Sequence, residues 1–180
     1  MLKEIGAQNG KNIVAHSYTR GGATLHDHYN NPEAVAMAEK YKPDYLIIQE
    51  QSQDVDIASI RKWIELGKIN GAKVILYHTW VDNCKPMLEA AGNEDLTIAP
   101  VGYAFNKFNR GECLCPSNLD SIPVLNNKGD FHPSAEGSYL AAIIIYKAMY
   151  GKLPLNPPES KTAREYWSRF LAADCRYQPH

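Results

Sequence analysis

The chain has 180 residues, 44% of them apolar, which is enough to bury one sizeable core but short for two ordinary domains. Its 19 Lys and Arg residues nearly balance its 20 Asp and Glu residues, so no overall field attracts nucleic acid or an anionic membrane surface. Its apolar runs are shorter than the roughly 20 residues that span a bilayer. We therefore expect one soluble domain with a small-molecule partner, and no nucleic acid or membrane partner. A secretion signal preceding Met1 would place the protein in the periplasm or outside the cell.

The four cysteines are Cys84, Cys113, Cys115 and Cys175. They would suffice for two disulfides, but a chain with this much core does not need disulfides to fold. The close pair lacks both the Cys-x-x-Cys spacing and the second pair of ligands that a zinc site requires. We therefore expect structural or free thiols, with no metal and no other cofactor.

The first half of the chain alternates helix and strand patterns. Helical spacing and end signals predict helices at 1–8, 32–41 and 57–69. Apolar runs predict strands at 12–18, 44–49 and 73–78. The loop at 19–31 is polar and contains Gly21 and Gly22. Each predicted strand is thus followed by a loop and a helix.

The second half continues this alternation. A fourth strand is predicted at 97–101, and helices at 85–91, 102–109, 135–150 and 161–172. Residues 153–158 form a proline-rich connector to the C-terminal helix. The β-α-β-α order predicts a parallel sheet wrapped by helices, within a single domain that covers 1–180.

Candidate functional residues follow the predicted strands, because ligands of open parallel sheets bind beyond the carboxyl ends of the strands. The backbone of Gly21 and Gly22 would approach a ligand closely and donate to a developing oxyanion, although both residues also suit an ordinary turn. Gln49 and Gln51 offer side-chain amides for the same purpose, or are surface polar residues. His78, at a strand end, would line the site.

His132 is the candidate general base. It lies between a long polar loop and a predicted buried helix, with Asp130 before it and Pro133 after it. His26 and His28, with Asp27 between them, suggest a metal-dependent hydrolase as a competing hypothesis. We favour it less, because metal ligands converge from several elements.

Five segments, in order along the chain, resemble the SGNH, or GDSL-like, hydrolase superfamily, in particular a bacterial branch with variant motif blocks. They are Gly-Gly-Ala-Thr-Leu at 21–25, Asp-Tyr-Leu-Ile-Ile-Gln-Glu-Gln-Ser at 44–52, Tyr-His-Thr-Trp at 77–80, Pro-Val-Gly-Tyr-Ala-Phe at 100–105 and His-Pro-Ser-Ala-Glu-Gly-Ser-Tyr-Leu-Ala-Ala at 132–142. The resemblance implies a flavodoxin-like, three-layer α/β/α domain that hydrolyses esters through a serine nucleophile. By that match His132 is the base and Gly22 the backbone oxyanion donor, and Gln49 or Gln51 replaces the family's asparagine.

The sequence departs from the family pattern in two places. The family's serine follows the first strand in a Gly-Asp-Ser or Gly-Asn-Ser block, which is missing here, so we expect that strand and serine to lie outside these 180 residues. The family spaces its acid as Asp-x-x-His, but Gly129 occupies that place, which leaves Asp130 or, less favourably, Asp120 to orient His132. We expect an acyl or acetyl esterase, acting on a small-molecule or carbohydrate ester. The alternative is a catalytically inactive binding protein of the same fold.

Overall fold

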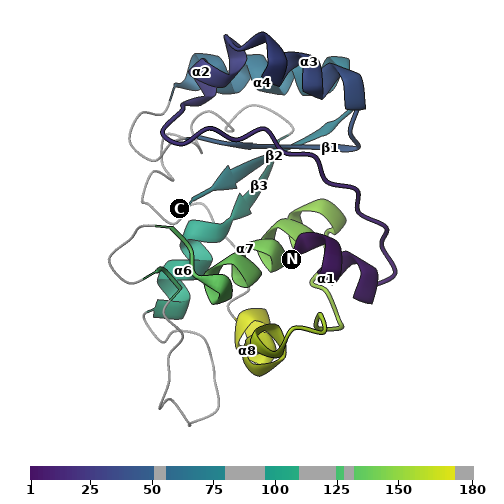
Figure 1. Ribbon diagram of the computed structural model, residues 1–180, viewed down its shortest axis with the longest axis vertical. Helices are drawn as coiled ribbons and strands as arrows, with labels where there is room; N and C mark the ends of the chain where they lie inside the picture. The colour runs from purple at the N-terminus through teal and green to yellow at the C-terminus, as the bar shows by residue number, and fades with distance from the viewer. Residues whose placement is uncertain (51–55, 80–95, 110–124, 128–131, 173–180) are drawn as a thin grey trace. The chain divides into compact units, whose positions relative to one another are not determined.

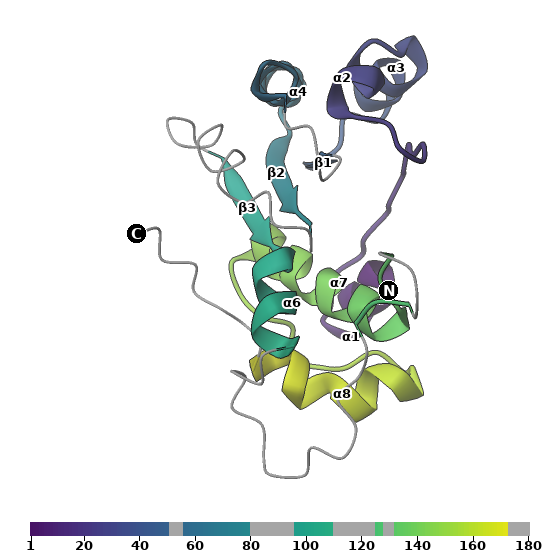
Figure 2. The ribbon, with the colours of Figure 1, turned by 90° about the vertical axis from the view of Figure 1, so that its left-hand side faces the viewer.

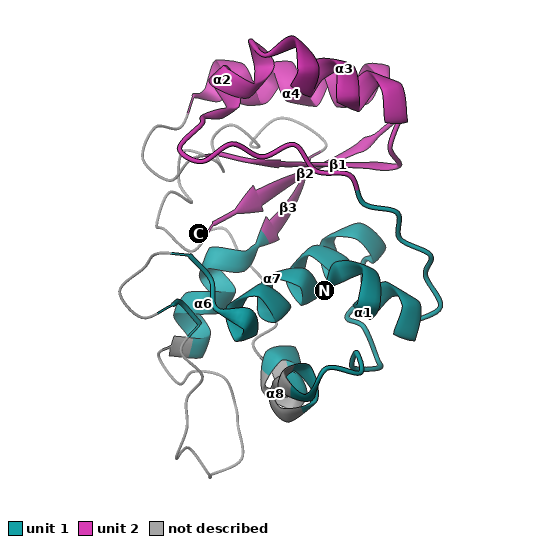
Figure 3. Cartoon of the chain, in the orientation of Figure 1, with its two compact units in different colours: residues 1–15, 100–180 teal, residues 16–99 magenta. Residues whose placement is uncertain are grey.

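A computed structural model describes residues 1–50, 56–79, 96–109, 125–127 and 132–172. The chain divides into two compact units (Figure 3), which are treated separately below. Unit 1 comprises Met1–Ala15 and Pro100–His180, and unit 2 comprises His16–Ala99. The fold is α/β, with an open, three-stranded parallel sheet, as predicted. Among the described helices, none has the length and apolar character needed to cross a membrane.

Unit 2 contains the sheet and the helices over one of its faces (Figures 1 and 2). Its elements are α2 (Leu25–Tyr29), α3 (Pro32–Tyr41), β1 (Tyr45–Gln49), α4 (Ile57–Ile69), β2 (Lys73–His78) and β3 (Thr97–Pro100, whose last residue belongs to unit 1). The strand order is β1-β2-β3. β1 and β2 run parallel, from Tyr45 beside Lys73 to Gln49 beside Tyr77. The carboxyl ends of these two strands therefore lie at the same edge of the sheet.

The core of unit 2 fills the space between the sheet and its helices. Its buried members are Leu25, Ala34, Ala38, Ile48, Ile60, Trp63, Ile64, Leu66, Val74 and Leu76. α4 approaches β2 closely, since a Cβ atom on Gly67 would overlap the side chain of Val74. Side chains of a strand alternate between the two faces, so Leu46 and Ile48 share the face that packs against this core.

Unit 1 is built around α7 (Ala135–Tyr150), which contacts the other three helices described in this unit. Those helices are α1 (Leu2–Gln8), α6 (Val101–Asn109) and α8 (Lys161–Ala172). The Ser134 hydroxyl caps α7 by accepting a hydrogen bond from the amide of Gly137, and Gly151 ends the helix in the left-handed conformation. α7 is thus the buried helix that its apolar sequence predicts.

The structure differs from the prediction in two segments. The prediction of a strand at 12–18 is wrong: this segment is extended but, among the described residues, pairs with no strand. Val14 is 70% exposed, whereas Tyr18 packs on the core of unit 2 and its hydroxyl accepts a hydrogen bond from Asn31 Nδ2 (2.6 Å). Side-chain contacts thus take the place of the backbone hydrogen bonds to a neighbouring strand that a β-strand requires. The second difference is α2, which lies in the predicted loop at 19–31. The predicted helix at 85–91 lies outside the described residues.

Candidate functional site

Buried polar side chains lie at the carboxyl ends of β1 and β2. Glu50 is 0% exposed, and His78 and Thr79 are each 3% exposed. Because Gln49 is the register partner of Tyr77, Glu50 and His78 follow at the same rim of the sheet. Polar side chains are seldom this deeply buried, so such a group at the usual ligand-binding edge of a parallel sheet marks a candidate site. His78 lies at the end of β2, as predicted, and its role at a site stays a prediction.

Glu50, rather than Gln49, is the residue of this segment that enters the protein interior. The side chain of Gln49 is exposed, and Gln51 lies outside the described residues. Alternation along the strand places Glu50 on the face of Leu46 and Ile48. The alternation of side chains along the strand is the sequence signal for this burial. The prediction instead favours the side-chain amides of Gln49 and Gln51, because a carboxyl group is rarely fully buried.

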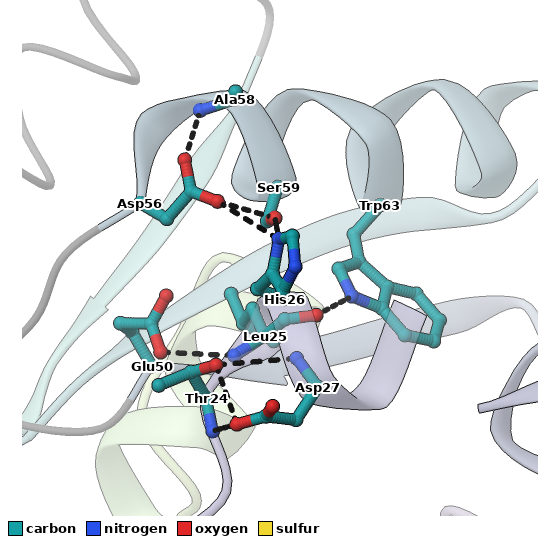
Figure 4. A network of polar contacts seen from close by, with 9 residues as sticks. All are labelled: Thr24, Leu25, His26, Asp27, Glu50, Asp56, Ala58, Ser59 and Trp63. Carbon is teal, nitrogen blue, oxygen red and sulfur yellow. Dashed lines mark hydrogen bonds and ion pairs between the residues drawn. The ribbon is translucent and has the colours of Figure 1, made fainter. Parts of the chain in front are cut away.

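A hydrogen bond from the amide of Leu25 to Glu50 Oε1 (2.9 Å) joins the end of β1 to the start of α2 (Figure 4). The carbonyl oxygen of Leu25 accepts a second hydrogen bond, from Trp63 Nε1 (3.0 Å). Trp63 belongs to α4 and is 5% exposed. The backbone N–H and C=O groups of Leu25 are thus both hydrogen-bonded to buried side chains, one at the end of β1 and one in α4.

Gly21 and Gly22 form the turn just before α2. The amide of Ala23 donates to the carbonyl oxygen of Arg20 (3.2 Å), and Gly22 has a φ of +73°. This φ at the third position of a four-residue turn favours glycine, which confirms the turn interpretation of the pair. Among the described residues other than the immediate chain neighbours, no heavy atom lies within 4 Å of the place where a Cβ atom on Gly21 or Gly22 would stand.

His26, Asp56 and Ser59 form a polar cluster between α2 and α4 (Figure 4). The Ser59 hydroxyl donates to Asp56 Oδ2 (2.6 Å), and His26 Nδ1 lies 3.3 Å from Ser59 Oγ and 3.5 Å from the same carboxylate oxygen. The hydrogen bond from the Ser59 hydroxyl lowers the pKa of Asp56. Asp56 also caps α4, because its carboxylate accepts a hydrogen bond from the amide of Ala58. Ser59 is 1% exposed and its proton points at the acid, so the cluster is a helix cap and not a nucleophile–base pair.

The competing metal hypothesis rested on His26, Asp27 and His28. The carboxylate of Asp27 accepts hydrogen bonds from the amide and the hydroxyl of Thr24 (2.9 and 2.8 Å), and Thr24 Oγ1 accepts from the amide of Asp27 (3.1 Å). These bonds form a capping box at the start of α2 and lower the pKa of Asp27. In the part of the chain that the structure describes, no three or more His, Cys, Asp or Glu residues are grouped for metal binding.

His132 belongs to unit 1, where it is exposed. Its carbonyl oxygen accepts from the amide of Asn127 (3.0 Å), next to an antiparallel bridge between Asn126 and Pro133. The amide of Ser134 then donates to the carbonyl oxygen of Leu125 (2.9 Å). The backbone at His132 is therefore fixed between a short antiparallel pairing and the cap of α7.

The other predicted site residues lie in both units or outside the described residues. Asp130 and the substitute acid Asp120 lie outside the described residues. Gly22 and Gln49 belong to unit 2, where the Glu50–Leu25 hydrogen bond brings their segments together. His132 belongs to the other unit.

Comparison with known protein families, with curated proteins and with solved structures finds no match to this chain. Its function is therefore inferred from features of this chain alone. They are the glycine turn before α2 and the buried polar side chains at the strand ends in unit 2, and the exposed His132 in unit 1.

Proposed function

We propose that the protein is an acyl or acetyl esterase that hydrolyses small-molecule or carbohydrate esters by serine-type catalysis. The observation that carries the proposal is the Glu50–Leu25 hydrogen bond. It joins the segments 21–25 and 44–52, two of the five that resemble the hydrolase superfamily, beyond the carboxyl end of a parallel strand. Ligands bind at that edge in open α/β sheets.

Each proposed residue has a role in acyl transfer. His132 takes the proton from the nucleophile and returns it to the leaving alcohol, and Asp130 orients its imidazole. The amide of Gly22 and the side chain of Gln49 or Gln51 donate hydrogen bonds to the oxyanion of the tetrahedral intermediate. Removing one such donor typically costs about a hundredfold to a thousandfold in rate.

The nucleophile is a serine outside these 180 residues. Ser134 caps α7, Ser59 donates its hydroxyl proton to the capping residue Asp56, and Ser17 lies in a segment that pairs with no described strand. Ser52, in the 44–52 segment, does not occupy the family's serine position.

Hydrolysis of p-nitrophenyl acetate tests the proposal. The coding DNA upstream of Met1 is read in frame for a strand followed by Gly-Asp-Ser or Gly-Asn-Ser, and the extended protein is assayed beside the 180-residue chain. We expect hydrolysis by the extended protein and at most a trace from the short chain, because the covalent route needs the serine. A fully active short chain that Ser17→Ala or Ser52→Ala silences would contradict this. An extended protein that binds acetylated sugars without hydrolysing them would favour the inactive binding protein.

A further inference from the structure

Glu50 combines complete burial with a long-range contact. Its side chain is 0% exposed, and its Oε1 atom accepts a hydrogen bond from an amide 25 residues earlier in the chain. A carboxyl group in such a place is costly compared with the apolar residues Leu46 and Ile48 on the same strand face. The acceptor gives the Leu25 amide a hydrogen-bond partner in the interior.

That amide belongs to the first residue of a very short helix. α2 has five residues, too few to be stable without tertiary contacts, and the amides of a helix's first turn have no partner within the helix. Glu50 supplies the partner for Leu25, and Trp63 Nε1 holds the carbonyl group of the same residue. The start of α2 is thus fixed by β1 and α4 together.

The start of α2 in turn fixes the glycine turn. Thr24 caps the helix through its capping box with Asp27, and the turn from Arg20 to Ala23 ends one residue earlier. Only Ala23 and Thr24 separate Gly22 from Leu25. A shift of Leu25 is therefore passed to Gly22 through a segment whose own hydrogen bonds keep it rigid.

We propose that Glu50 is a positioning residue: its carboxyl group, as a hydrogen-bond acceptor, holds the Gly21–Gly22 turn in place for oxyanion binding. This inference rests on the proposed esterase function for its catalytic part. Its structural part, the link from Glu50 through Leu25 to the turn, is independent of any activity. The role needs an acceptor oxygen and no negative charge, so a glutamine should replace the glutamate.

The first test measures amide hydrogen exchange by NMR in the 180-residue chain. Glu50→Leu removes the acceptor, Glu50→Gln keeps it, and Glu39→Leu, at an exposed position of α3, is the matched control. We expect exchange of the Leu25 amide to quicken at least about tenfold in Glu50→Leu, with smaller increases at 20–24, and little change in the other two variants. An unchanged Leu25 amide in a folded Glu50→Leu protein would overturn the proposal.

The second test measures ester hydrolysis by the extended protein with the same variants. We expect Glu50→Leu to lower kcat by about tenfold to a hundredfold with KM nearly unchanged, and Glu50→Gln to stay within about threefold of the parent with the same pH profile. A Glu50→Gln protein as impaired as Glu50→Leu, or with an altered pH profile, would show that the carboxyl proton takes part in the reaction and would overturn the positioning role. If no form hydrolyses esters but the exchange result holds, the esterase proposal fails and the link from Glu50 to the turn stands.

Discussion

Gly137 lies so close to Leu125 that a Cβ atom on the glycine would overlap the leucine's carbonyl oxygen. The same carbonyl oxygen accepts the hydrogen bond from the amide of Ser134. The first turn of α7 is therefore packed directly against the backbone that pairs with the His132 loop. The absence of a side chain at Gly137 leaves room for the carbonyl group of Leu125 against the first turn of α7.

Gly137→Ala should destabilise the protein by about 2 kcal/mol or more, because the overlapping atom belongs to the backbone and cannot rotate away. The free energy of unfolding in urea measures this effect. Ser138→Ala, at the next position of α7, is the control and should change stability by less than about 0.5 kcal/mol. Equal effects of the two substitutions would mean that the close contact is absent.

The two glycines of the turn before α2 should respond differently to alanine. Gly22→Ala places a side chain at a φ of +73° and should cost about 1–2 kcal/mol. Gly21 does not have a positive φ, and among the described residues beyond its chain neighbours no heavy atom lies within 4 Å of its Cβ position, so Gly21→Ala should be neutral or stabilise by up to about 1 kcal/mol. Thermal unfolding of both variants checks the order. A Gly22→Ala protein as stable as the parent would contradict the turn described here.

Ser59→Ala should raise the pKa of Asp56 towards its ordinary value of 3.8, because the serine hydroxyl is the main cause of the lowered pKa. A carboxyl group whose pKa is lower in the folded state adds stability above its unfolded pKa, and loses it as the pH falls through the folded value. Stability of the variant should therefore depend less on pH below about 3.8. Carboxyl carbon NMR titration measures the shift. The pKa of Asp27 is lowered by Thr24, and it should not move.

Asn9 joins α1 to the connector at 153–158. Its Oδ1 atom accepts from the amides of Leu155 and Asn156 (2.7 and 2.9 Å), and its Nδ2 atom donates to the carbonyl oxygens of Ile5 and Asn156 (2.8 and 2.9 Å). Asn9→Ala should cost about 1–2 kcal/mol, since four hydrogen bonds are lost at a partly exposed site. Asn9→Asp keeps the acceptor but sets a carboxylate oxygen against the carbonyl oxygens of Ile5 and Asn156 at the C-terminal end of α1, so it should cost at least as much as Asn9→Ala. Chemical denaturation of the two variants tests this order.

Most of the fold could be predicted because its elements carry local signals. Pro32 at the start of α3, the continuous apolar run of β1 and the apolar circumference of α7 each specify one type of structure. The segment 12–18 has a strand's composition but pairs with no described strand, and strand formation depends on a partner that composition does not reveal. Residues Thr24 to Asp27 carry the Ser/Thr-x-x-acid spacing of a helix start, a signal that the prediction passed over.

The site could be predicted only in part, because its assembly depends on contacts far apart in the sequence. The turn at Gly22 and the strand end at Gln49 follow from local pattern. The hydrogen bond from Leu25 to Glu50 does not, since the partner amide lies 25 residues away and no local rule connects the two residues. The close packing of Gly137 against Leu125 likewise arises only when the folded chain brings α7 against a distant loop.

The most direct test of the esterase proposal is the rate of p-nitrophenyl acetate hydrolysis by the extended protein carrying His132→Ala. The control is His26→Ala, which removes an exposed histidine from the cap of α4, and circular dichroism melting confirms that both variants fold. The account predicts that His132→Ala lowers kcat/KM by about a thousandfold or more, while His26→Ala stays within about threefold of the parent. A folded His132→Ala protein that keeps more than about a tenth of the parent's activity would contradict it.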